Sequence, residues 1–335
     1  MLAPQACGRT FQVLRCAIST AMPAPFRDRL RSSPVVLEVV PPSRRASDKS
    51  IAGFVQRVRE AARVIPDLDA VNVPEVLDEN HEGQPFYRNL DPRDFVTRLG
   101  ADLGVDPIVN KVVAHLPSAA ALRRWVGESS SDFAVRSFVL VGGTSGRVRY
   151  PGPSVVEADR VLRAAVRGRA DVALGNITIP ERESEIDRLM EKTQAGCDFF
   201  TSQVLFEAEP MATVLRAYGR RCAAQGIEPA TFLLSFAPVS DYQDIEFLVW
   251  LGATVTPRTE EALLASVEPG SGRPSFDRAR TLWSQLRAAA ALSRPPVPLG
   301  VNVEMISTHN FDVAVQMARE FCAARKGSGA RAGDV

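Results

Sequence analysis

The sequence "VVLEVVPPSRR" at residues 35–45 reads as a buried strand that ends abruptly. A near-continuous run of Val and Leu is typical of a parallel strand that is covered on both faces. Pro41 and Pro42 end the run, since proline lacks the backbone N–H that a strand ladder needs. Glu38 lies inside the run, where a low dielectric raises the pKa of a carboxyl group unless a cation pairs with it. Glu38 is therefore either a functional acid or the partner of a base such as Lys111.

Seven further apolar runs follow this first strand and repeat its pattern. They lie at 69–73, 111–116, 136–141, 171–177, 198–205, 231–237 and 299–305. Amphipathic helical stretches separate them, at 51–62, 92–103, 118–127, 154–167, 183–195, 209–225, 241–251, 275–292 and 310–324, with a short extra helix at 259–266. Eight strand–helix units predict an α/β protein, a single-domain (β/α)8 TIM barrel. An open doubly wound sheet is the alternative, but no G-x-G-x-x-G follows the first strand.

The predicted domain covers residues 34–325. Residues 1–33 carry five Arg and one acid, so we expect a disordered or targeting-like extension that contributes nothing to the fold. That segment is either an organellar signal or an over-extended start, with Met22 as the initiator. Residues 326–335 are predicted to form a disordered tail.

Composition excludes several classes of function. The net charge is +1, so nucleic acid is not an expected partner, and no apolar run approaches the roughly 20 residues that span a bilayer. The three His residues form no HxH or HExxH pattern, so no metal is predicted. The five Cys residues show no CxxC spacing, which indicates reduced thiols and a cytoplasmic protein. The sequence leaves both a monomer and a homo-oligomer open.

Polar residues recur where the predicted strands end, which is where the reactive groups of such barrels lie. They are Glu38, Asn72, Glu75, His115, residues 142–146, Asn176, Thr178, Thr201, Gln203, 240–242, Asn302 and Glu304. A single buried polar group often has only a structural role. His115 taken alone is more typical of a core histidine whose hydrogen bonds are made within the protein. A set at corresponding strand ends predicts a mouth lined for a ligand, because unpaired polar groups in strands cost free energy.

Four of these segments resemble the methylenetetrahydrofolate reductase family. The segment "LEVVPP" matches the family's first-strand "FEFFPP", and "AHLPS" matches its third-strand His-Leu pair. The segments "QAGCDFFTSQVLFE" (194–207) and "LSFAPVSDY" (234–242) match its sixth and seventh strands. The resemblance covers roughly residues 35–325 and implies a TIM barrel that acts in one-carbon metabolism and methionine biosynthesis.

The resemblance also implies roles for single residues. The family reduces 5,10-methylenetetrahydrofolate to 5-methyltetrahydrofolate with NADH or NADPH, and FAD relays the hydride. Glu38 would be the general acid that opens the folate ring. Gln203 would bind the pterin and Tyr242 would stack on the folate or nicotinamide ring, and we add Asn302 and Glu304 of the eighth strand to this substrate-binding set. The predicted cofactor-binding residues are His115, Gly143, Thr144, Asn176, Thr178, Arg182 and Lys192.

The departures from the family pattern concern the flavin more than the folate. The fourth strand ends in "LVGGT" where the family has "ALRGD", and "ITIPERESE" replaces "YPExHPE". Either FAD binds differently, with Arg182 and Lys192 at its phosphates, or a flavin-free enzyme passes hydride directly from nicotinamide to folate. A second hypothesis is a folate-binding barrel without reductase activity, which acts in methyl transfer or as a partner in a larger complex. A barrel enzyme with an unrelated substrate is a third.

Overall fold

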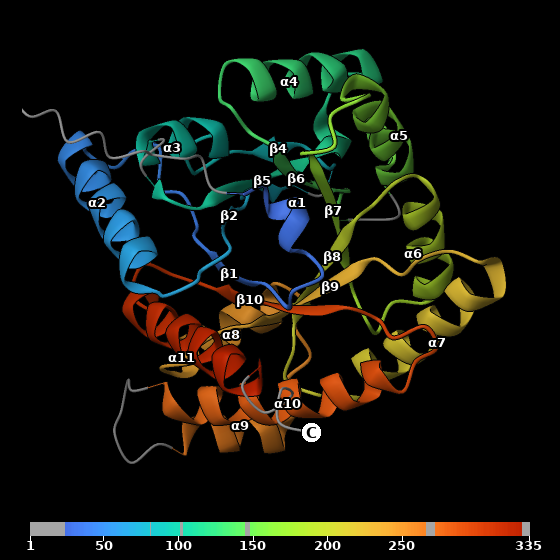
Figure 1. Cartoon of the computed structure of the whole chain (residues 1–335). Coiled ribbons are helices and arrows are strands. Elements are labelled where there is room, and N and C mark those ends of the chain that lie inside the picture. Colours follow the sequence, from blue (N-terminus) through green and yellow to red (C-terminus); the bar gives the residue numbers. More distant parts are fainter. Residues whose placement is uncertain (1–23, 81, 101–102, 145–147, 266–271, 330–335) are drawn as a thin grey trace, which may run out of the picture.

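The computed structural model describes residues 24–80, 82–100, 103–144, 148–265 and 272–329. In this part of the chain, eight parallel strands close into a barrel in the order β1-β10-β9-β8-β7-β6-β5-β2 (Figure 1). The strands are β1 (Val35–Glu38), β2 (Ala70–Val73), β5 (Asp106–Val112), β6 (Ser137–Val141), β7 (Ala173–Thr178), β8 (Phe199–Val204), β9 (Thr231–Phe236) and β10 (Leu299–Glu304). The predicted single-domain TIM barrel is confirmed.

Helices surround the ring of strands (Figure 1). They are α2 (Asp48–Val64), α3 (Pro92–Leu99), α4 (Ala119–Ser131), α5 (Val155–Ala165), α6 (Glu185–Gln194), α7 (Glu209–Gln225), α10 (Arg273–Ala291) and α11 (Phe311–Gly329). The Ser118, Ser154 and Asp241 side chains accept hydrogen bonds from backbone N–H groups in the first turns of α4, α5 and α8 (Tyr242–Trp250), which explains where these helices begin.

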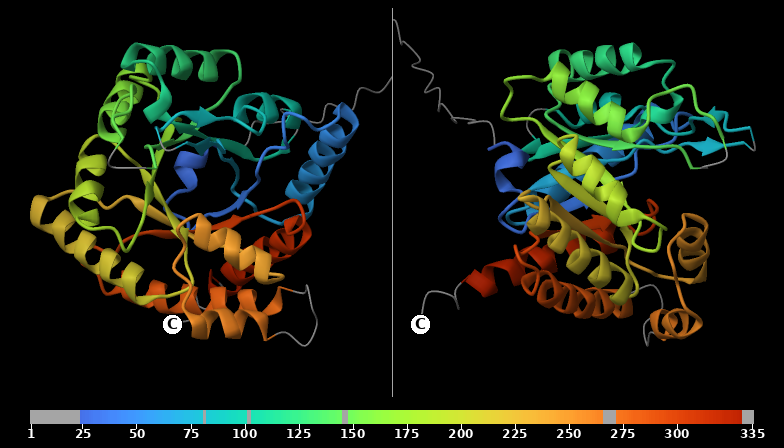
Figure 2. Two further views of the ribbon diagram at one scale, coloured as in Figure 1. Left: turned by 180° about the vertical axis from the view of Figure 1, so that it is seen from behind. Right: turned by 90° about the vertical axis from the view of Figure 1, so that its right-hand side faces the viewer.

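Three small elements lie at the C-terminal ends of the strands. Helices α8 (Tyr242–Trp250) and α9 (Pro257–Leu264) follow β9, and α9 is the predicted extra helix. A short hairpin of β3 (Asp78–Glu79) and β4 (Pro85–Phe86) follows β2 and has no counterpart in the prediction. The hairpin and the two helices project from the same end of the barrel (Figure 2, right).

The third barrel strand is displaced from its predicted position. It was predicted at 111–116, whereas β5 begins at Asp106 and ends at Val112. Residues Val113–His115 form a 3-10 turn, so His115 lies beyond the strand rather than in it. The opening Asp106-Pro107 reads as a turn in the sequence, but proline is tolerated at the start of a strand.

The segment just before β1 belongs to the barrel, which corrects the expectation that residues 1–33 contribute nothing to the fold. Helix α1 (Phe26–Arg29) closes the N-terminal end of the barrel, where Phe26 is fully buried. Its ring packs edge-on against Phe199 at a centroid distance of 5.6 Å, and its backbone N–H donates a 2.7 Å hydrogen bond to Asp106. A helix of four residues has too little periodicity to be recognised. Residues 1–23, and with them the targeting-like signal, lie outside the described residues.

The disordered tail was predicted to begin at residue 326, which is before the last helix ends. Helix α11 continues to Gly329, so the chain is helical beyond residue 325. Residues 330–335 lie outside the described part of the chain.

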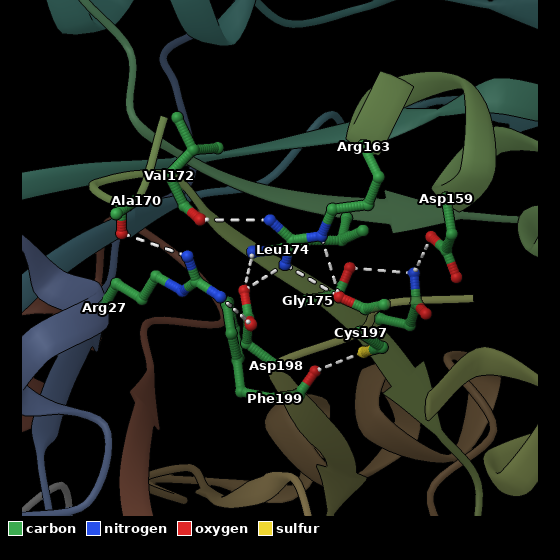
Figure 3. A network of polar contacts seen from close by, with 12 residues as sticks. Arg27, Asp159, Arg163, Ala170, Val172, Leu174, Gly175, Cys197, Asp198 and Phe199 are labelled. Atoms are coloured by element: carbon green, nitrogen blue, oxygen red, sulfur yellow. Dashed lines mark hydrogen bonds and ion pairs between the residues drawn. The ribbon is translucent and has the colours of Figure 1, made fainter. Parts of the chain in front are cut away.

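A network of ion pairs fastens α1 to the barrel wall (Figure 3). The Arg27 guanidinium donates to Asp198 Oδ1 at 3.1 Å and to the Ala170 carbonyl at 3.0 Å. Arg163 of α5 pairs with the second carboxylate oxygen of Asp198. These contacts line a cleft of about 740 Å³ on the N-terminal face, opposite the mouth. The guanidinium groups of Arg27 and Arg163 are thus engaged in holding the floor in place.

The strand pleat defines which residues face the barrel lumen. Above Phe26 and Leu30 lies a buried layer of Val36, Ala70, Ile108, Val139, Ala173, Phe199 and Leu233. Because side chains alternate along a strand, the residues two positions further on also point inward. That upper layer contains Glu38, Asn72, Asn110, Thr201, Ser235 and Asn302. A closed apolar floor and a polar upper layer leave the C-terminal mouth as the place for a ligand.

Candidate functional site

Glu38 ends β1 and is partly buried in the upper layer of the lumen. Two amide groups donate to its Oε2 atom: Asn72 Nδ2 of β2 at 2.6 Å and Asn302 Nδ2 of β10 at 3.2 Å. Burial raises the pKa of Glu38 to about 7, and these two hydrogen bonds oppose part of the rise. Lys111, the base considered as its partner, instead pairs with Glu75 at 2.5 Å. Glu38 thus has the environment of a general acid that works near neutral pH.

A second carboxyl group stands beside the first. Glu304 of β10 is the register partner of Glu38, so the two side chains lie on neighbouring strands and face the same lumen. Asn302 Nδ2 lies 3.4 Å from Glu304 Oε1 and 3.1 Å from Ser235 Oγ. Burial, together with the charge of Glu38, raises the pKa of Glu304 well above its usual value.

The layer around these two carboxyl groups is rich in unsatisfied acceptors. The side-chain oxygens of Asn72, Asn110, Thr201 and Asn302 are buried and have no hydrogen-bond partner within the protein. A buried polar atom without a partner costs about 1–3 kcal/mol, so such atoms point to an external partner. A ligand that presents several N–H groups would match this surface.

Gln203 and Tyr242 lie at the rim. Gln203 is near the end of β8, and its Nε2 donates a 2.6 Å hydrogen bond to the carbonyl oxygen of Leu251, just after α8. Tyr242 opens α8 and is 50% exposed, so its ring is available for stacking. The predicted catalytic residue Glu38 meets the predicted substrate residues Asn302 and Glu304 in the lumen. The other two predicted substrate residues, Gln203 and Tyr242, lie on the α8 side of the mouth.

Two predicted cofactor residues, His115 and Thr144, belong to a hydrogen-bonded cluster around Glu79, and a third, Gly143, packs against its Tyr150 ring. His115 Nε2 lies 2.8 Å from Glu79 Oε1, and the hydroxyl groups of Thr144 and Tyr150 donate to Oε2 at 2.6 and 2.7 Å. Burial alone would raise the pKa of Glu79, but the bonds from Thr144, Tyr150 and His115 together hold it below its usual value. The Tyr150 ring covers Gly143 so closely that a Cβ there would lie 2.2 Å from it.

The other predicted cofactor residues lie on the outer side of β7. Inward positions on this strand are taken by Ala173 and Ile177, so Asn176 and Thr178 point toward the helices. Asn176 Nδ2 donates to Asp159 of α5 at 3.0 Å, and burial raises the pKa of Asp159 to about 7.

Lys192 and Arg182 are likewise engaged on this side of the barrel. Lys192 Nζ donates to the Ile177 carbonyl at 2.8 Å, and Arg182 lies 3.6 Å from the Glu185 carboxylate. The seven residues therefore fall into two groups, one around Glu79 and one behind β7. This arrangement does not fit one flavin held as the resemblance implies.

Glu79 and Tyr150 were not foreseen from the sequence. Glu79 meets His115 across 36 positions and Tyr150 across 71, and neither residue belongs to a periodic segment. Among the residues that the structure describes, no group of three or more His, Cys, Asp or Glu is placed to hold a metal ion. In the same part of the chain, no helix combines the length and apolar character needed to cross a membrane.

Comparison with protein-family models and with curated proteins finds no match for the chain. Among solved structures, it is similar to an uncharacterized protein from Clostridium thermocellum that binds two copies of 5-methyl-5,6,7,8-tetrahydrofolic acid. The identity is 18% and the TM-score 0.71, over 89% of this chain and 99% of that one. The Bacillus cereus spore cortex-lytic enzyme SleL is 11% identical, with a TM-score of 0.50 over 87% of this chain and 75% of that one. At these identities the likeness shows the barrel fold.

Proposed function

We propose that the chain binds a reduced folate in the barrel mouth and reduces 5,10-methylenetetrahydrofolate to 5-methyltetrahydrofolate with a reduced nicotinamide. The observation that carries this proposal is Glu38, a lumen-facing carboxyl group whose pKa is raised to about 7. The Clostridium thermocellum protein of similar fold binds 5-methyltetrahydrofolate, the product of this reaction, which supports the choice of ligand.

The upper layer of the lumen suits a reduced pterin. A tetrahydropterin presents the N–H groups of its 2-amino group, N3 and N8, and the orphaned oxygens of Asn72, Asn110 and Asn302 are acceptors. Tyr242 supplies an exposed aromatic face for stacking at the rim. Gln203, which the family resemblance assigns to the pterin, stands at the same rim.

Glu38 performs the proton transfer in this proposal. Its carboxyl proton goes to N10 of the folate, the bond between N10 and the methylene carbon breaks, and N5 becomes a methylene iminium. Hydride from C4 of the nicotinamide then forms the methyl group, which leaves the nicotinamide oxidised. The carboxylate left on Glu38 stabilises the iminium cation, because charge attraction is strong in a partly buried site.

The proposal takes hydride directly from the nicotinamide. The residues predicted for FAD are engaged in the Glu79 cluster or lie behind β7, so we derive no step through a flavin. The test is oxidation of NADH and of NADPH by purified protein that lacks bound flavin, with 5,10-methylenetetrahydrofolate and with or without added FAD.

We expect equal rates with and without FAD, and no flavin absorption in the purified protein. Activity that appears only after FAD is added, or a yellow protein with bound flavin, would overturn direct transfer and favour the rearranged flavin site.

A folate-binding barrel without reductase activity is the second candidate. The loss of a coherent flavin site favours it, as does a structural neighbour whose stated property is binding of 5-methyltetrahydrofolate. Such a protein would act in methyl transfer or as a partner in a larger complex. It is distinguished by calorimetry: binding of 5-methyltetrahydrofolate together with no nicotinamide oxidation at any folate concentration would favour it over the reductase.

A further inference from the structure

Glu38 and Glu304 converge on one amide group. Asn302 Nδ2 is 3.2 Å from Glu38 Oε2 and 3.4 Å from Glu304 Oε1, and Ser235 Oγ is a third oxygen at 3.1 Å. An amide NH2 has only two hydrogens to donate. Asn302 therefore shares its two hydrogens among three oxygens. Asn72 Nδ2 also donates to Glu38, and the Ser235 side chain hydrogen-bonds to Glu304, so the two carboxyl groups are held by uncharged donors.

The side chains around the pair are uncharged. The inward residues of the other described strands near this level are Asn72 of β2, Asn110 of β5, Val141 of β6, Ile177 of β7, Thr201 of β8 and Ser235 of β9. Lys111 of β5 follows the inward Asn110 in the chain and is paired with Glu75. Two neighbouring carboxylates without a cation repel each other, so the pair holds on to a proton at pH values where a single exposed carboxyl group has lost it.

We propose that Glu304 is the proton-holding partner of Glu38 and resupplies it during turnover. The inference rests on the proposed function, because it assigns Glu304 a role in the same folate reduction. Glu304 acts through Glu38 and is thus a positioning residue, with no contact to the reacting carbon required.

Solvent supplies the proton that each turnover consumes. Glu38 gives its proton to N10 of the folate and becomes a carboxylate. The proton on Glu304 then passes to Glu38, and water reprotonates Glu304. Each turnover consumes one proton from solvent and one hydride from the nicotinamide. At a pH above that at which Glu38 alone would be ionised, the pair still holds one proton, which passes from Glu304 to Glu38 and on to N10. The iminium cation then offsets the charge of the two carboxylates until water reprotonates the pair, and the site therefore remains active at this pH.

The first experiment is an infrared titration of carboxyl groups in the ligand-free protein, for the native chain and for Glu304→Gln. Glu261→Gln, at an exposed position on α9, is the control. We expect the native chain to lose a carboxyl band in an alkaline step that is absent from Glu304→Gln and present in the control. An unchanged alkaline step in Glu304→Gln overturns the inference, whether or not the protein reduces folate.

The second experiment is the pH profile of folate-dependent nicotinamide oxidation for the native chain, Glu304→Gln and Glu304→Asp. Glu304→Gln should lose activity roughly tenfold per pH unit above about pH 7, while the native chain and Glu304→Asp retain it to higher pH. A rate lowered equally at every pH in Glu304→Gln would show a structural role only.

The two experiments separate the inference from the function on which it rests. If the native chain shows no activity but does show the expected infrared step, the proposed reductase function is wrong. The proton shared by Glu38 and Glu304 is then still a property of the site.

Discussion

Asn72 donates a hydrogen bond of 2.6 Å to Oε2 of Glu38, across the pair of neighbouring strands β2 and β1. This contact orients the carboxyl group in the lumen and stabilises its ionised form. Burial acts in the opposite direction and is the larger effect, so the pKa of Glu38 settles at about 7. The acid strength of the proposed proton donor therefore depends on the amide N–H group of Asn72.

Replacing Asn72 with Ala should move the pH profile to higher pH. The Glu38 carboxylate loses a hydrogen-bond donor, so its pKa rises. The protonated form that the reaction needs then persists to a pH roughly one unit higher. The measurement is kcat/KM for nicotinamide oxidation from pH 6 to 10. Asn110→Ala is the matched control, a lumen-facing amide on β5. An alkaline limb that stays in place in Asn72→Ala, or moves equally in both variants, contradicts this account of Glu38.

Glu38 should also make the free energy of unfolding depend on pH. Its folded-state pKa of about 7 lies above the ordinary value of 4.5, so the folded chain keeps a proton that the unfolded chain has released. The contribution of Glu38 to stability therefore falls as the pH rises from about 4.5 to about 7. Urea unfolding should find Glu38→Gln more stable relative to the native chain at pH 8 than at pH 4.5, by roughly 3 kcal/mol at most. Parallel pH dependences for the two proteins would contradict the raised pKa.

The Glu79 cluster can be tested through Gly143. A Cβ at this position would lie 2.2 Å from the Tyr150 ring, so Gly143→Ala must displace that ring from Glu79. We expect a loss of about 1–3 kcal/mol in the free energy of unfolding. Gly53→Ala is the control, since nothing lies within 4 Å of a Cβ there, and it should stabilise helix α2 by about 0.5–1 kcal/mol. Equal effects of the two substitutions would show that Tyr150 does not pack over Gly143.

The barrel floor should depend on Phe26. Phe26→Ala removes a fully buried ring that closes the N-terminal end, and large-to-small changes of this kind cost about 3–5 kcal/mol. Leu292→Ala is the comparison, because Leu292 is 78% exposed and should change the free energy of unfolding by less than about 0.5 kcal/mol. If urea unfolding gives similar midpoints for both variants, α1 does not close the barrel as described.

The barrel could be predicted because most of its strands are unbroken apolar runs between amphipathic helices. Two elements were not predicted correctly, for reasons that lie in their local sequence. The start of β5 is Asp106-Pro107, which looks like a turn, and α1 is a single helical turn in an Arg-rich segment. In both cases tertiary packing stabilises a backbone that the local pattern does not favour.

The site was only partly predictable. Glu38 stood out because it interrupts an apolar run, and Asn302 and Glu304 because they end a strand. Asn176 and Thr178 also end a strand but point toward the helices, since strand-end position alone does not say which face a side chain takes. The Glu79 cluster joins three loops, and no single segment carries a signal for it.

The most direct test of the account is a comparison of the native chain with Glu38→Gln, in which binding and turnover are measured on the same preparations. Calorimetry with 5-methyltetrahydrofolate should give similar affinities, because Gln keeps the size and polarity of the side chain. Oxidation of reduced nicotinamide with 5,10-methylenetetrahydrofolate should fall by at least 100-fold, the usual contribution of a general acid. Unchanged turnover in Glu38→Gln, or a native chain that binds no folate, would contradict the central claim.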